Sequence, residues 1–113
     1  MASPGGTPYR IRWAPVAFQD LDEIIDYVSA QDGPGSAAIL FSTIMKRCGT
    51  LSRHPARCRI VPELKSVGVT EYRELIVSPY RVFFRIYENE VGVVGVLDGR
   101  RDLEETLIRR AMR

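Results

Sequence analysis

Residues 71–107 read EYRELIVSPYRVFFRIYENEVGVVGVLDGRRDLEETL, and this stretch decides the fold. Three segments, Tyr72 to Val77, Tyr80 to Tyr87 and Val91 to Leu97, are rich in β-branched and aromatic residues, which predicts three strands followed by a basic tail. Because only short turns separate the strands, they are expected to form an antiparallel meander. The third segment is almost wholly apolar, which is typical of a central strand covered on both faces.

The two faces of the second predicted strand differ in character, since successive side chains of a strand point to opposite sides. One face is entirely apolar and is expected to lie in the core: Tyr80, Val82, Phe84 and Ile86. The other face carries charge, and its two aromatic rings would be exposed unless something covers them: Arg81, Phe83, Arg85 and Tyr87.

The N-terminal half supplies the elements that cover this sheet. Alternation in YRIRW predicts a first strand over residues 9–13, with Tyr9, Ile11 and Trp13 on its buried side. Apolar residues at helical spacing predict two helices, 15–31 and 36–53, with Ser36 as the N-cap of the second. Their buried stripes include Phe18, Leu21, Ile25 and Val28 in the first helix and Ala37, Leu40, Phe41, Ile44, Cys48 and Leu51 in the second.

The predicted fold class is therefore α+β: an N-terminal strand and a two-helix antiparallel hairpin packed on a twisted antiparallel sheet. Residues 1–8 are expected to be a flexible N-terminal tail without the features of a signal peptide, and residues 9–113 a single domain. Arg59 to Val61 could form a short strand, and Lys65 to Thr70 a loop.

Composition restricts the classes of function. No apolar run is long enough to span a membrane, so we expect a cytoplasmic protein. Cys48, Cys58 and the single His54 do not form a metal-ligand motif, so we predict no metal and no cofactor. Residues 14–45 hold five acids and no Lys or Arg, whereas from Lys46 onward fourteen Lys or Arg face nine Asp or Glu. This asymmetry favours a basic working face on the meander half, although scattered solvated arginines would give the same count.

Three motifs in this order resemble the RelE/ParE superfamily of toxins from bacterial type II toxin–antitoxin systems. They are YRIRWAPVAFQDLDEIIDYV near the start, LSRHPARCRIVPEL in the middle and EYRELIVSPYRVFFRIYENEVGVVGVLDGRRDL near the end. The resemblance covers nearly all of residues 9–107. It implies a cognate antitoxin as partner, whose C-terminal segment folds as it wraps the toxin, and it suggests Phe83 and Tyr87 as antitoxin-binding residues.

One branch of this superfamily cuts mRNA on the ribosome without a metal. The resemblance implies Arg73, Arg81, Arg100 and Arg101 as its phosphate-neutralising residues in this chain. The usual late tyrosine is replaced by Leu107, and Asp98 stands where a histidine is common, so no good general acid or base remains. Tyr87, Glu104 and Glu105 are the residues to test first for a missing proton shuttle.

The other branch, the ParE-like toxins, shares the fold, lacks the nuclease residues and poisons DNA gyrase. PARCRIVPEL and VLDGRRDL favour this branch, in which arginines form a recognition surface: Arg81, Arg85, Arg100 and Arg101. The protein would be an enzyme, a metal-independent endoribonuclease, only in the branch that cuts mRNA. A third alternative is an inactive relic that only binds its antitoxin. Arg73 and Arg85 could also merely pair with acids on neighbouring strands.

Overall fold

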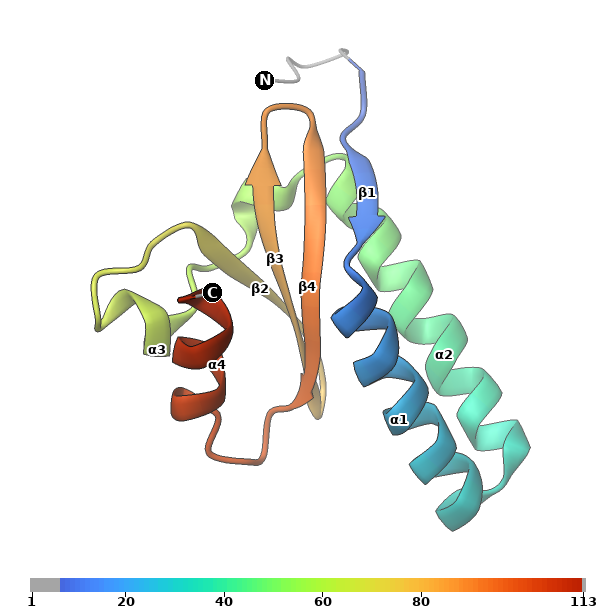
Figure 1. The fold of residues 1–113 in the computed structure, drawn as a ribbon. Coiled ribbons are helices and arrows are strands. Elements are labelled where there is room, and N and C mark those ends of the chain that lie inside the picture. The colour runs from blue at the N-terminus through green and yellow to red at the C-terminus, as the bar shows by residue number, and fades with distance from the viewer. Residues whose placement is uncertain (1–6, 113) are drawn as a thin grey trace.

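The computed structural model describes residues 7–112, which form one sheet with helices on both of its faces (Figure 1). The strands are β1 (Arg10–Trp13), β2 (Tyr72–Val77), β3 (Tyr80–Tyr87) and β4 (Glu90–Asp98). The helices are α1 (Pro15–Asp32), α2 (Pro34–Gly49), α3 (Pro62–Lys65) and α4 (Glu104–Ala111), with short 3₁₀ turns at Thr50–Ser52 and Pro55–Arg57. The predicted tail, residues 1–8, lies almost wholly outside the described residues.

The sheet has the strand order β1-β4-β3-β2, so β4 is central, as its apolar sequence predicted. β2, β3 and β4 form the expected antiparallel meander. The α+β class is confirmed, but the sheet is mixed because β1 pairs with β4 in parallel, with Ile11 opposite Val91. The expectation of a wholly antiparallel sheet is therefore wrong for β1. No tight turn joins β1 to its neighbour, and nothing in its own sequence sets its direction.

The α1–α2 hairpin packs against the sheet and forms the main core with it. Phe84 of β3 and Ile44 of α2 are completely buried there, and Leu21 of α1 is 1% exposed. Val82, Val91 and Val93 complete the centre of this layer. The apolar face predicted for β3 thus lies against the hairpin, as the alternation required.

Some details of the hairpin differ from the prediction. α2 begins at Pro34, directly after Gly33, whose φ of 93° lies in the left-handed region, so Ser36 is not its N-cap. α2 ends at Gly49, and the chain continues as a 3₁₀ turn. Phe18 and Phe41 are 49% and 45% exposed. Too many apolar residues of the two helices were predicted to be buried, because a helix on a narrow sheet buries only part of its apolar side. Phe18 instead stacks on Trp13.

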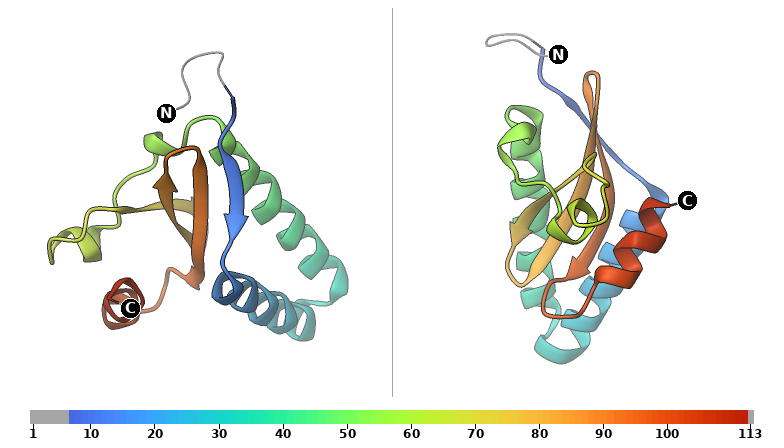
Figure 2. Two further views of the ribbon diagram at one scale, coloured as in Figure 1. Left: turned by 45° about the horizontal axis from the view of Figure 1, so that its top comes forward. Right: turned by 90° about the vertical axis from the view of Figure 1, so that its left-hand side faces the viewer.

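The other face of the sheet is partly covered by α3 and α4, two helices that the sequence analysis did not predict. In Figure 2, α4 and α2 lie on opposite sides of the strands. Phe83 is 2% exposed in a second apolar cluster together with Val61, Leu64, Leu103 and Leu107. Phe83 is therefore covered by other segments of the same chain. Residues 59–61 form a single bridge, between Ile60 and Arg73, rather than a strand.

No helix among residues 7–112 is long and apolar enough to cross a membrane.

Candidate functional site

Arg81, the most prominent candidate of the sequence analysis, is bound inside the molecule. Its Nη1 and Nη2 atoms donate to the two carboxylate oxygens of Glu63, each at 2.7 Å, and its Nε donates to Glu74 Oε1 at 2.7 Å. Glu74 is 2% exposed and also accepts from Arg59. Only 11% of the Arg81 side chain is exposed, and its ion pairs join α3 to the sheet.

This ion-pair network shifts the pKa values of Glu63 and Arg81 in the directions expected for oppositely charged partners. Hydrogen bonds from Arg81 lower the pKa of Glu63, against the opposing effect of partial burial. The hydrogen bonds to Glu63 raise the pKa of Arg81, which keeps the guanidinium charged at any pH of interest. Arg81 is therefore a structural cation rather than a proton carrier.

The remaining strand candidates occupy the opposite end of the meander. The Nη1 atom of Arg73 donates to the Cys58 carbonyl at 2.6 Å, which ties β2 to the preceding loop. Arg85 lies over the rings of Tyr72 and Tyr87. Tyr87 is 44% exposed, as expected.

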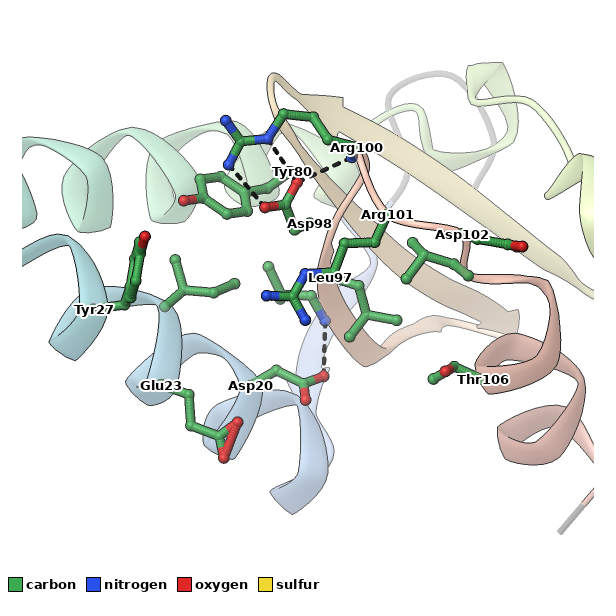
Figure 3. Close-up of a pocket in the computed structure, with 13 residues that line it drawn as sticks. Asp20, Glu23, Tyr27, Tyr80, Leu97, Asp98, Arg100, Arg101, Asp102 and Thr106 are labelled. Atoms are coloured by element: carbon green, nitrogen blue, oxygen red, sulfur yellow. Dashed lines mark hydrogen bonds and ion pairs between the residues drawn. The ribbon is translucent and has the colours of Figure 1, made fainter.

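Arg100 and Arg101 line a cleft between α1 and the connection from β4 to α4 (Figure 3). The cleft has a volume of about 540 Å³. Tyr27 and Glu23 line it on the α1 side, and Tyr80 and Leu97 on the sheet side. The chain reaches this position because β4 ends at Asp98 and turns through Gly99 back toward α4. This cleft is the candidate functional site.

Arg100 is fixed by hydrogen bonds to Asp98, two residues earlier in the same turn. Its Nη2 donates to Asp98 Oδ2 at 2.8 Å, and its Nε and backbone N–H both donate to Asp98 Oδ1 at 3.0 Å. These hydrogen bonds from Arg100 lower the pKa of Asp98 to about 2. Asp98 is therefore a permanent carboxylate, and the Arg100 guanidinium that it neutralises is mostly turned to solvent.

Arg101 is the exposed cation of this cleft. Its side chain extends from the connection toward α1, into the space between Glu23 and Leu97 (Figure 3). Among the described residues, Arg101 has no ion pair within 4.0 Å. A guanidinium that points into a cleft without a fixed partner can bind an incoming carboxylate or phosphate in a bidentate way.

Two tyrosines give the cleft an aromatic side that sequence reasoning missed. Tyr27 is 64% exposed, whereas Tyr80 is 7% exposed. Burial, followed by the charge of Asp98, raises the pKa of Tyr80, so its phenol stays protonated near neutral pH and donates rather than accepts a proton. Tyr27 was overlooked because an exposed helix residue gives no sequence signal until the other side of the cleft is known.

A buried ion pair fixes the floor of the cleft. Asp20 of α1 accepts from Arg110 of α4 at 2.7 and 2.9 Å and from the Val96 backbone N–H at 3.0 Å. A Cβ at Gly95 would lie 2.9 Å from Arg110 Nη1, so a larger residue there would force the guanidinium to shift within this pair. The pair connects the first and last helices across β4 and thereby positions the chain that carries Arg101.

The other residues proposed from the sequence lie outside the cleft. Leu107, at the place of the nuclease tyrosine, is 4% exposed and packs in the second apolar cluster. Glu104 and Glu105 are exposed on α4, where Glu105 makes a 3.7 Å pair with Arg109. Neither glutamate lines the cleft.

The sequence matches one known protein family. Residues 11–103 match the family described as "ParE toxin of type II toxin-antitoxin system, parDE". The chain belongs to the ParE toxin family. It is thus a toxin of a type II toxin–antitoxin system, as the motifs suggested. No curated protein matches the sequence at a significant level.

Two solved structures are similar to this ParE-family chain in fold. A chain of the chromosomal ParDE system from P. aeruginosa has 22% identity and a TM-score of 0.68, with 80% of this chain and 95% of that chain covered. A chain of the toxin–antitoxin complex RelBE2 from Mycobacterium tuberculosis has 21% identity and a TM-score of 0.55, with 81% and 92% covered. At this level of identity the similarity shows the fold alone, and both branches of the superfamily share it.

Proposed function

We propose that this toxin inhibits bacterial growth by poisoning DNA gyrase, and that the cleft carrying Arg101 is its contact with the target. The membership in the ParE family supports this proposal. The principal observation is that Arg101 projects into a cleft as a cation with no ion-pair partner among the described residues. Binding to a protein–DNA target requires such a recognition group and no proton transfer.

The protonation states in the cleft favour recognition over chemistry. Asp98 stays ionised and is already neutralised by Arg100, while Tyr80 stays protonated. Asp20 is occupied by Arg110. Cleavage by a 2′-hydroxyl needs a group that accepts a proton and another that gives one, with pKa values near the working pH. Asp98 and Tyr80 do not meet that requirement.

The test uses purified gyrase, plasmid DNA and ATP, without ribosomes. Toxin at saturating concentration is expected to block supercoiling or to trap cleaved DNA, and Arg101→Ala is expected to raise the required concentration about tenfold, as for one lost charge-assisted contact. Arg53→Ala, which removes an exposed arginine outside the cleft, is the matched control. Unchanged supercoiling at saturating wild-type toxin would overturn the proposal.

Ribosome-dependent mRNA cleavage is the second candidate, because Glu23 and Tyr27 lie in the same cleft as Arg101. In that case a reconstituted translation system shows cut mRNA while gyrase is unaffected. Glu23→Gln should then abolish cleavage and leave binding intact, with a loss on the order of a hundredfold or more, as for a lost catalytic group. Glu105→Gln, on an exposed face of α4, is the control.

We further propose that the toxin acts in the cytoplasm and is silenced by a cognate antitoxin, with Tyr87 among the contact residues. Expression of the toxin alone should stop growth, and co-expression with the protein encoded beside it should restore growth. Healthy growth of cells that contain soluble, folded toxin alone would favour the inactive alternative. Phe83 is not a suitable contact while α4 covers it.

A further inference from the structure

The turn end of the meander carries an arginine- and tyrosine-rich surface on the face away from the hairpin. In register, Arg12 of β1, Gly92 of β4, Arg85 of β3 and Tyr72 of β2 form one row across all four strands. Arg10, Glu90 and Tyr87 form the adjacent row. We call these two rows the open face. The end of the β3–β4 hairpin extends beyond α4, so this part of the sheet is not covered by a helix (Figure 2).

Planar groups on the open face are held in contact with one another. The guanidinium carbon of Arg85 lies 5.0 Å from the ring centroid of Tyr87 and 5.6 Å from that of Tyr72. A Cβ at Gly92 would lie 2.9 Å from Cε2 of Tyr87, so the ring in this position lies over the glycine and would have to shift if a side chain were added there. The arrangement is an aromatic ring, a guanidinium plane and a second ring side by side on a sheet.

Charge on the open face is positive. Arg10 and Arg12 are exposed on the edge strand, and Arg85 is half-buried between the rings, whereas Glu90 is the one carboxylate of the two rows. A groove of about 610 Å³ runs beside them along β1 and β4, between Arg12, Tyr87 and Val94. An anionic chain lying in this groove would have a cation on one side and a planar group on the other.

This combination fits a single-stranded nucleic acid. Bases without a partner stack on tyrosine rings and on guanidinium planes, and arginines beside the stack neutralise the phosphates. Four-stranded sheets with exposed aromatic residues are a recurrent platform for two or three such bases. An acidic peptide would pair with the arginines but would not stack on the aromatic rings. A duplex keeps its bases stacked inside the double helix, so they are not available to stack on protein side chains.

We propose that the open face binds a single strand of DNA or RNA through stacking on Tyr87 and Arg85 and through phosphate contacts of Arg12. This inference goes beyond the proposed function, because it holds whichever target the cleft recognises. The open face and the cleft lie at opposite ends of β3 and β4, since Tyr87 and Tyr80 are the two ends of β3. Along an eight-residue strand this is a separation on the order of 20 Å.

The test is fluorescence anisotropy with the full chain, purified free of partners, and labelled oligonucleotides of about 12 nucleotides. The probes are oligo(dT), oligo(rU), a duplex of the same length and a poly-glutamate peptide. We expect both single strands to bind more tightly than the duplex and the peptide, with an affinity that falls between about 50 and 200 mM salt. A preference for oligo(dT) or for oligo(rU) identifies whether DNA or RNA is the ligand of the open face.

Variants separate stacking from charge. Tyr87→Ala is expected to weaken single-strand binding about tenfold, and Arg12→Ala to weaken it and to reduce the salt slope by about 0.7. Phe41→Ala is the matched aromatic control, because Phe41 is 45% exposed on α2 and Tyr87 is 44% exposed. Arg109→Ala, on the exposed side of α4, is the matched arginine control, and both controls should leave binding unchanged.

Three outcomes would overturn the inference. The first is the absence of single-strand binding at low salt by a chain that melts cooperatively. The second is equal weakening by Tyr87→Ala and Phe41→Ala, which would indicate binding to charge anywhere on the surface. The third is tighter binding of poly-glutamate than of either oligonucleotide, which would assign the open face to an acidic peptide. Because gyrase and ribosomes are both absent, none of these results depends on the proposed function.

Discussion

The two faces of the sheet are built on different principles. Under the α1–α2 hairpin, one apolar cluster runs from Ala17 to Val96 and is interrupted by no ion pair among the described residues. Under α3 and α4, a smaller cluster around Phe83 is flanked by two ion pairs, the buried pair of Glu74 with Arg81 and the part-buried pair of Asp20 with Arg110. The first face is thus stabilised mainly by apolar burial, whereas on the second face ion pairs add to a smaller apolar cluster and fix short helices in place.

This difference explains why the arginines of the meander are not equivalent. Arg81 lies where a helix must be held, and two carboxylates surround it. Arg101 and Arg12 lie where the sheet or the chain after it is uncovered, and both are exposed. Arginines of one sheet and of the connection that follows it can therefore have different roles, and the covering helices decide which of them are exposed.

The largest effect is expected from a charge in the apolar face. Phe84→Asp places an unpaired carboxylate at a fully buried position, which costs several kcal/mol, comparable to the total stability of about 5–15 kcal/mol of a small domain. We expect no cooperative thermal transition by circular dichroism. Tyr87→Asp, at an exposed position of the same strand, should melt near the wild-type temperature. A cooperative Phe84→Asp transition at that temperature would contradict the distinction between the faces.

The second largest effect is expected from the buried carboxylate of the charged face. Glu74→Gln removes the negative charge that Arg81 and Arg59 share and should cost about 3 kcal/mol in urea unfolding, at the lower end for a buried pair because Arg81 keeps its pair with Glu63. Glu105→Gln, whose side chain is 92% exposed, should change stability by less than about 0.5 kcal/mol. Equal effects of the two variants would mean that the network contributes no more than a surface pair.

A smaller and local effect is expected from the Asp20–Arg110 pair. Asp20→Asn keeps an acceptor for the Val96 N–H but loses the charge that holds α4, at a cost of about 1.5–3 kcal/mol. Amide hydrogen exchange in residues 104–111 should accelerate, while exchange in the α1–α2 hairpin should stay near wild type. Acceleration spread evenly over both regions would show that α4 is not a separately held element.

The smallest effect is the pH dependence of the charged face. Hydrogen bonds lower the pKa of Glu63 and bring that of Asp98 to about 2, so each carboxylate stabilises the fold above its unfolded-state pKa. That stability is lost as the pH falls through the lowered values. The melting temperature should be flat above about pH 5 and decline by a few degrees toward about pH 2. In Glu63→Gln combined with Asp98→Asn, the decline should be shallower, and an unchanged decline would assign it to other groups.

The apolar side of this comparison could be predicted from the sequence, and most of the charged side could not. Alternation in β3 and helical spacing in α1 and α2 indicate burial directly, because the apolar residues in these patterns mark the side of the element that faces the core. The partners of Arg81 lie eighteen and seven positions away, and Asp20 and Arg110 are separated by ninety. No periodicity connects such residues. Sequence reasoning therefore gave no sign that Glu63 and Glu74 hold Arg81, and it did not place Tyr27 and Tyr80 beside the cleft.

The sequence by itself determined the α+β class, the meander, the central place of β4, the helix hairpin and, through motif order, the RelE/ParE resemblance. These follow from local patterns of polarity and from residues in a fixed order along the chain. Only the tertiary structure decided the parallel direction of β1, the covering of Phe83 by α4, and which arginines remain exposed. The physical reason is that an ion pair or a covered ring depends on what a distant segment brings to it, and that information exists only once the chain is folded.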